Sequence, residues 1–140
     1  MRVLWYNTRT MKTKRTKFTE LKKVFERLHG PKGCPWDKKQ THASLLKYLT
    51  EEAREFAAEV RRKDYTHMEE ELGDVLLQVM FHAQLASKEG RFDVEDVIDT
   101  LIRKLRRRHP HVFGKVKVRS VRHVITNWNK IKAEEKRCKK

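Results

Sequence analysis

Apolar residues recur at intervals of three and four along most of the chain, which is the spacing of one face of an α-helix. Polar and charged residues fill the other positions, so each segment is expected to bury one stripe and expose the rest. The pattern predicts five helices, over residues 17–28, 42–63, 67–88, 94–109 and 120–136. Residues 112–118 alternate only weakly and have no obvious pairing partner, which favours a loop over a strand.

Glycine and proline mark where several of these helices end. Gly30 and Pro31 follow the first helix, Gly90 follows the third and Pro110 follows the fourth, which Asp93 is expected to cap. Residues 30–40 combine glycines and prolines with a tryptophan, which is typical of an ordered loop. Only residues 64–66 separate the second and third helices, so an antiparallel hairpin is expected. The predicted fold class is all-α, a helical bundle built on this central helix hairpin.

The length of 140 residues suits about one domain. We expect a helical domain over residues 17–137, preceded by a basic, mobile arm over residues 1–16 and followed by a basic tail over residues 138–140. No run of 18 apolar residues is present, which argues against a membrane span, and the first residues do not resemble a signal peptide. The two cysteines lack zinc spacing and are expected to be free thiols, so we expect a cytoplasmic protein.

The formal net charge of +15 is unevenly distributed. Residues 1–40 carry a net charge of +9, residues 41–100 carry −7 and residues 101–140 carry +13. A uniformly basic surface would favour nucleic acid as the partner. An acidic middle between two basic ends is more typical of a cation site flanked by anion-binding groups.

Two acidic pairs at a spacing of three residues lie in the predicted hairpin, Glu52 with Glu55 and Glu71 with Asp74. This spacing places each pair on one face of its helix, and antiparallel packing can bring the two faces together. Four carboxylates in one groove would take up protons or a hard divalent cation, and Mg²⁺ fits best. A single such pair is far more often a solvated helix face.

Two features favour a site over a solvated face. Like-charged pairs at this spacing destabilise a helix by a few tenths of a kcal/mol, and here two helices carry such a pair. Gly73 also interrupts a strong helix pattern, at a cost of about 1 kcal/mol relative to alanine. A glycine at that position indicates the close approach of another helix or a ligand.

Several motifs in a fixed order carry a family resemblance. They are Gly33-Cys34-Pro35-Trp36-Asp37, Gln40-Thr41, the acids Glu51, Glu52 and Glu55, the run Glu71-Leu72-Gly73-Asp74, Lys104-Leu105, Arg107 through Phe113, and Trp128 through Lys132. Over about residues 17–137 the chain resembles the MazG family of nucleoside triphosphate pyrophosphohydrolases. Many members carry two tandem copies, and this chain is similar to the amino-terminal copy.

The resemblance implies an all-α enzyme that acts as a homodimer or higher homo-oligomer and cleaves a nucleoside triphosphate to the monophosphate and pyrophosphate. It implies a requirement for Mg²⁺, with Mn²⁺ as a substitute, and removal of non-standard nucleotides as one expected role. The implied metal ligands are Glu52, Glu55, Glu71 and Asp74, and the implied catalytic residues are Glu51 and Glu52, with Glu51 as an outer group or as the base for water. The implied nucleotide-binding residues are Lys104, Arg107, Arg108, Trp128 and Lys132.

Each of these residues also has a simpler explanation. Arg106 to His109 would be a solvated helix end that the helix dipole favours, and large aromatic residues such as Trp128 and Trp36 more often pack in a core. Two other functions stay open. A basic helical module would bind nucleic acid weakly through residues 103–108 and the two basic ends, and an inactive scaffold would dimerise through its apolar helix faces.

Overall fold

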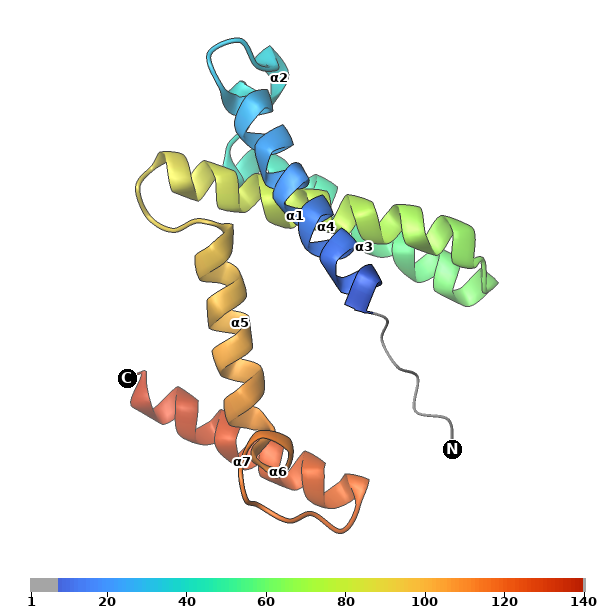
Figure 1. Ribbon diagram of the computed structural model, residues 1–140, viewed down its shortest axis with the longest axis vertical. Helices are drawn as coiled ribbons and strands as arrows, with labels where there is room; N and C mark the ends of the chain where they lie inside the picture. Colours follow the sequence, from blue (N-terminus) through green and yellow to red (C-terminus); the bar gives the residue numbers. More distant parts are fainter. Residues whose placement is uncertain (1–7, 140) are drawn as a thin grey trace. The chain divides into compact units, whose positions relative to one another are not determined.

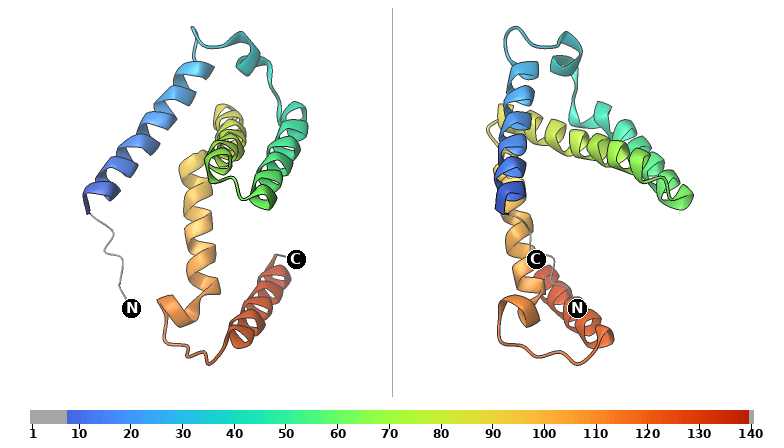
Figure 2. Two further views of the ribbon diagram at one scale, coloured as in Figure 1. Left: turned by 90° about the vertical axis from the view of Figure 1, so that its right-hand side faces the viewer. Right: turned by 45° about the vertical axis from the view of Figure 1, so that its right-hand side comes forward.

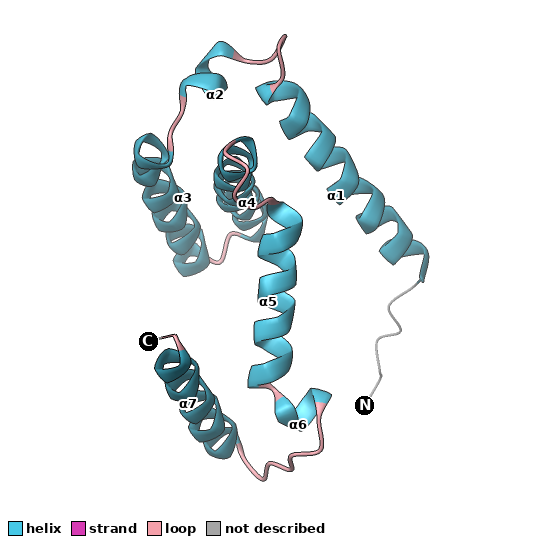
Figure 3. Cartoon of the chain, turned by 90° about the vertical axis from the view of Figure 1, so that its left-hand side faces the viewer, coloured by secondary structure: helices cyan, strands magenta, loops and turns pink. Residues whose placement is uncertain are grey.

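The computed structural model describes the backbone of residues 8–139 and the side chains of residues 17–139 (Figure 1). Within these ranges the chain forms helices joined by loops and turns, and no strand is present (Figure 3). The helices are α1 (Thr8–His29), α2 (Pro35–Lys39), α3 (His42–Arg62), α4 (Tyr65–Lys88), α5 (Val94–Arg108), α6 (Pro110–Phe113) and α7 (Val121–Cys138). The predicted all-α class is therefore confirmed.

The first helix is longer than its apolar pattern indicates. It begins at Thr8 rather than at Lys17, so α1 extends into the segment that was expected to be a mobile arm. The start of that arm, residues 1–7, lies outside the described residues, as does Lys140 of the expected tail. The extension was not predicted because residues 8–16 have no apolar periodicity.

Two short helices, α2 and α6, occupy segments that were expected to be loops or a helix end. Pro35 and Pro110 stand in the first turn of these helices. Proline suits that position because its fixed φ is helical and the N–H that it lacks has no partner there. Pro110 therefore ends α5, as predicted, and also begins α6.

The central pair α3 and α4 forms the predicted antiparallel hairpin (Figure 2). A capping box starts α3, in which the Thr41 hydroxyl accepts from Ser44 N at 3.1 Å and the Ser44 hydroxyl accepts from Thr41 N at 2.9 Å. The turn passes through Lys63, which has a φ of 59°, and Asp64 then caps α4. The other end of α4 is at Lys88, and the chain then turns at Gly90, where the φ of 67° suits glycine.

The buried core lies between α1, the start of α3 and the second half of α4. The buried apolar side chains among the described residues are Phe25, Leu45, Met80, Phe81, Ala83 and Ala86. Phe81 meets the rings of Phe25 and Trp36 edge to face, with centroids 5.9 and 6.3 Å apart. The tryptophan therefore packs on the hairpin, as the ordered-loop prediction required. The first half of α4 lies outside this core.

The chain divides into two compact units, residues 1–93 and residues 94–140. Unit 1 contains α1 to α4, and unit 2 contains α5 to α7. In unit 2, the apolar residues Leu101, Ile102 and Leu105 share a face of α5 and are 40–48% exposed. Among the described helices, none is long and apolar enough to cross a membrane.

Candidate functional site

The hairpin of unit 1 brings together three of the four carboxylates that the sequence singles out. Glu52 and Glu55 lie on α3 and Glu71 lies on α4, and one carboxylate oxygen from each is within 4.8 Å of the others. Glu52 and Glu71 are half-buried, whereas Glu55 is exposed. The i, i+3 spacing on α3 places its two acids on one face, and the antiparallel pairing adds the acid from α4.

The environment of Glu52 and Glu71 favours the protonated forms of these two carboxylates. Burial raises the pKa of Glu52, and the charges of Asp74, Glu55, Glu71 and Glu51 raise it further. Burial also raises the pKa of Glu71, with smaller contributions from Glu55, Asp74 and other nearby acids. Asp74 is therefore close enough to act on both side chains, although it is not one of the three whose oxygens lie within 4.8 Å.

These residues fit a hard divalent cation. Oε2 of Glu71 is buried and has no hydrogen-bond partner among the described residues. A buried oxygen without a donor is costly, and clustered carboxylates repel one another. A divalent cation with oxygen ligands would relieve both penalties, so Glu52, Glu55, Glu71 and Asp74 are the residues that would hold Mg²⁺.

Apart from the backbone of α4 itself, a Cβ atom built on Gly73 would meet no atom within 4 Å, so within the described part of unit 1 the expected close approach of another helix is not seen. The space beside Gly73 is open. Glu51 is exposed on α3 and is not one of the clustered acids, although its charge acts on Glu52.

The predicted nucleotide-binding residues lie on two helices of unit 2. Lys104, Arg107 and Arg108 are in the last two turns of α5, and Trp128 and Lys132 are on α7. The guanidinium carbon of Arg108 lies 5.1 Å from the centre of the Trp128 ring, which is a cation–π distance. The structure brings Arg108 and Trp128 together, while Arg107 and Lys132 are exposed and Lys104 is half-buried.

A residue that the sequence analysis missed, Glu135 on α7, binds both arginines. Arg107 donates from Nε to Oε1 of Glu135 at 2.6 Å. Arg108 donates from Nε to Oε1 at 3.3 Å and from Nη2 to Oε2 at 2.7 Å. Hydrogen bonds from Arg108 and then Arg107 lower the pKa of Glu135 to about 2. The charge pattern could have indicated Glu135 as a partner for the basic residues, because Glu134 and Glu135 are the only acids in residues 101–140.

Histidines take part in contacts in both units. In unit 1, Nδ1 of His42 and Nδ1 of His82 are 2.7 Å apart, so one ring nitrogen donates a hydrogen bond to the other between α3 and α4. Nε2 of His82 is buried and has no partner in the described structure. In unit 2, Nδ1 of His109 lies 2.7 Å from the carbonyl oxygen of Leu105, and its ring meets Trp128 edge to face.

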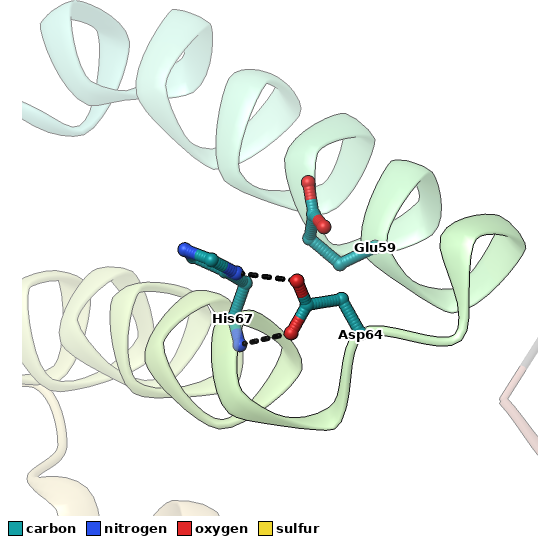
Figure 4. A group of neighbouring side chains, drawn as sticks. All are labelled: Glu59, Asp64 and His67. Carbon is teal, nitrogen blue, oxygen red and sulfur yellow. Dashed lines mark hydrogen bonds and ion pairs between the residues drawn. The ribbon is translucent and has the colours of Figure 1, made fainter.

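A second group of potential metal ligands, Glu59, Asp64 and His67, lies at the turn between α3 and α4 (Figure 4). Asp64 accepts from the backbone N of His67 at 3.2 Å and is 2.7 Å from its Nδ1. Glu59 is paired with Arg62 at 2.6 Å. These oxygens already have donors, so we assign the group to capping α4 and stabilising the turn.

Comparison with protein families gives a match to one domain. A family model described as the MazG nucleotide pyrophosphohydrolase domain matches residues 40–113. The matched range contains the acidic cluster of unit 1 and the basic end of α5 in unit 2.

Curated proteins show the same relationship. The chain is 53% identical over 123 residues to the nucleoside triphosphate pyrophosphohydrolase/pyrophosphatase MazG of Thermotoga maritima, covering 88% of this chain and 47% of that protein. It is 50% identical over 119 residues to the uncharacterized protein YabN of Bacillus subtilis, covering 85% of this chain and 24% of that one. It is 44% identical over 114 residues to the nucleoside triphosphate pyrophosphohydrolase of Escherichia coli, covering 81% of this chain and 43% of that protein. The chain thus spans less than half the length of these relatives.

A solved structure supports the fold. The crystal structure of a MazG-related protein from Thermotoga maritima aligns with a TM-score of 0.66 at 29% sequence identity. The alignment covers 81% of this chain and 96% of the other. The helical architecture described above is therefore shared with a protein of similar size.

Proposed function

Because this chain belongs to the MazG family of nucleotide pyrophosphohydrolase domains, we propose that it hydrolyses nucleoside triphosphates to the monophosphate and pyrophosphate. The observation that carries the proposal is the group of Glu52, Glu55 and Glu71, whose carboxylate oxygens lie within 4.8 Å of one another beside Asp74. A solvated helix face would not bury an oxygen of Glu71 without a donor.

The reaction breaks the bond between the α-phosphorus and the oxygen that bridges to the β-phosphorus. Glu52, Glu55, Glu71 and Asp74 would hold Mg²⁺, or Mn²⁺ in its place. When bound, such an ion withdraws charge from phosphate oxygens and lowers the pKa of a water ligand. Glu51, exposed next to the cluster, would orient the attacking water and accept its proton.

The basic residues of unit 2 would bind the nucleotide. Arg107 and Arg108 offer planar N–H groups that match phosphate oxygens, and Lys104 and Lys132 add positive charge. These groups would stabilise pyrophosphate as it leaves with the electron pair of the broken bond. Trp128 offers a ring for stacking, although one side of that ring already meets Arg108.

The central test is a panel of ordinary and non-standard nucleoside triphosphates with Mg²⁺ and identification of both products. We expect a monophosphate and pyrophosphate, and we expect faster turnover of non-standard nucleotides if the protein removes them. Glu52→Gln should lower kcat at least about a hundredfold, the usual effect of removing a group that acts in the transition state. Glu69→Gln, an exposed acid on the same hairpin outside the cluster, is the matched control. Orthophosphate as the product, or no turnover of any nucleotide, would reject the proposal.

Thermal unfolding tests the metal site without relying on activity. Burial and neighbouring charges raise the pKa of Glu52, so at neutral pH its ionised form destabilises the folded, metal-free protein. Without a divalent ion, Glu52→Gln should therefore raise Tm, by an amount equivalent to about 0.5 kcal/mol. Mg²⁺ should raise the Tm of the wild type more than that of the variant. Equal Mg²⁺ effects on both proteins would contradict the assignment.

We further propose that the protein forms a homodimer or higher homo-oligomer. Leu72, Leu76 and Val79 share one face of α4 and are 39–49% exposed, which supports the burial of that face by another copy. A second candidate function, weak nucleic-acid binding, is supported by the net charge of +13 in residues 101–140. Steeply salt-dependent RNA binding that survives Glu52→Gln would favour that candidate.

A further inference from the structure

The contact between Glu135 and the two arginines is partly buried and well ordered by hydrogen bonds, unlike a typical surface ion pair. The side chains of Arg108 and Glu135 are only 14% and 16% exposed, whereas that of Arg107 is 55% exposed. Water therefore screens the Arg108–Glu135 pair poorly, and its two hydrogen bonds hold the planes of both groups. All three residues belong to unit 2.

Glu135 leaves most of the donors of these arginines unused. A guanidinium carries five N–H groups, and the carboxylate engages one from Arg107 and two from Arg108. One negative charge also opposes two positive charges, so the group keeps a net charge of +1. Glu135 therefore orients the arginines without neutralising them or covering all their donors.

Trp128 also contacts the guanidinium of Arg108 and helps to fix its orientation. It precedes Glu135 by seven residues on α7, which is about two helical turns, so both side chains lie on one face of that helix. That face offers Arg108 a ring at 5.1 Å and a carboxylate at 2.7 Å. The orientation of Arg108 is thus set by two contacts from one rigid element.

We propose that Glu135 is a positioning residue for phosphate binding: it holds Arg107 and Arg108 so that their remaining N–H groups meet the phosphates of the substrate. The inference rests on the proposed function, because it assigns the arginines to the nucleotide. Two adjacent guanidiniums repel each other, and a carboxylate between them offsets that repulsion before the substrate arrives. Holding the side chains in advance lowers the entropy that is lost on binding.

The direction in which a Glu135 substitution changes anion affinity distinguishes a positioning role from a purely electrostatic one. If Glu135 contributed only its negative charge, its removal would strengthen the binding of an anion nearby. If it positions the arginines, its removal lets them move apart, and anion binding weakens. Glu135→Gln is the appropriate change because it keeps the shape of the side chain and removes the charge.

The experiment measures the affinity of the 140-residue chain for tripolyphosphate by calorimetry. We expect Glu135→Gln to weaken binding about tenfold, the effect of losing roughly one charge-assisted hydrogen bond. Glu134→Gln makes the same charge change at an exposed neighbour and should leave the affinity unchanged or slightly higher. Glu135→Asp keeps the charge on a shorter side chain and should restore part of the affinity.

A double-mutant cycle shows whether Glu135 acts through an arginine. Arg107→Gln is made in the wild type and in the Glu135→Gln variant, and each affinity for tripolyphosphate is measured. Glu135→Gln should reduce the affinity for tripolyphosphate less in the Arg107→Gln background than in the wild type, because Glu135 acts partly by positioning Arg107. If Glu135→Gln fails to fold, the same cycle is run with Glu135→Asp.

Three results would overturn the inference: tighter tripolyphosphate binding by Glu135→Gln, an unchanged affinity with only a lower Tm, or no tripolyphosphate binding by the wild type. Because the probe needs no turnover, failure of the proposed function is seen separately, as a protein that binds tripolyphosphate but hydrolyses no nucleotide. With an active enzyme, Glu135→Gln should raise KM by a larger factor than it lowers kcat.

Discussion

At the scale of single residues, two glycines of unit 1 have opposite surroundings. A Cβ atom on Gly33 would lie 1.9 Å from the carbonyl oxygen of Leu28, so the loop after α1 can pass this point only without a side chain. A Cβ atom on Gly73 would lie in open space inside α4. The same residue type is therefore required at one position and costs stability at the other.

Alanine substitutions test this difference. Gly33→Ala should lower the free energy of unfolding by about 1–3 kcal/mol, because the backbone must shift to admit the methyl group. Gly73→Ala should raise it by about 0.5–1 kcal/mol, the difference in helix propensity. Urea unfolding of the two variants and the wild type measures both changes. A destabilised Gly73→Ala would show that a second copy or a ligand does approach this face.

The acids of unit 1 could be selected from residue spacing, but their arrangement could not. Spacing places Glu52 with Glu55 on one face of a helix. Whether Glu71 meets them depends on the register and crossing angle of α3 and α4, which bury Leu45 and Phe81 elsewhere along the hairpin. Asp74 illustrates the limit, because it lies close enough to act on Glu52 but is not among the three that meet.

At the scale of helices, the pair His42 and His82 joins the start of α3 to the second half of α4. Their Nδ1 atoms are 2.7 Å apart, and a hydrogen bond at that distance requires one nitrogen to stay unprotonated. Burial lowers the pKa of His82, and His42 lowers it further. The folded hairpin therefore favours the neutral ring of His82.

Acidification should weaken this contact. The pKa of His82 is lower in the folded protein than in the unfolded chain, where it is about 6.5. The neutral His82 ring therefore stabilises the fold above about pH 6.5, and this stabilisation is lost as the pH falls through the pKa of the folded state. Wild-type protein should consequently lose more stability between about pH 7 and pH 5 than His82→Gln does. Thermal unfolding across this range measures the difference. His123→Gln, an exposed histidine on α7, should behave like the wild type. Equal pH dependence of His82→Gln and wild type would contradict the prediction.

The helices that were predicted well are those with an apolar stripe and a cap. Thr41 and Ser44 close the start of α3, so its first residue was predictable from local chemistry. The five-residue α2 was missed because a helix so short is not stable by itself and depends on tertiary packing. The apolar face of α5 was predicted correctly as a pattern, but the pattern does not say what covers it.

At the scale of the whole molecule, the main prediction is that the protein forms an oligomer in solution. Leu72, Leu76 and Val79 expose a continuous stripe on α4. The solution mass should exceed the 16.9 kDa of one chain, and Tm should rise with protein concentration. Light scattering after size exclusion measures the first quantity, and thermal unfolding at several concentrations measures the second.

Substitutions on α4 test whether the apolar stripe of this helix forms the contact between copies. Leu76→Glu should shift the protein toward the monomer, because it places a charge in the apolar stripe. Tyr65→Glu, at the highly exposed first residue of the same helix, should leave the mass unchanged. A mass of one chain at every concentration would refute the oligomer, and an unchanged mass for Leu76→Glu would place the contact elsewhere.

Four features could be predicted from the order of residues alone: the helical class, the antiparallel hairpin, the acidic pairs and the series of motifs that carries the family resemblance. These features depend on local periodicity and capping, which neighbouring residues decide. Helix packing, in contrast, determines that Glu71 meets the acids of α3, that no described helix of unit 1 covers Gly73, and that Glu135 binds Arg107 and Arg108. Such contacts join residues far apart in the chain, and their distances follow from how whole helices pack.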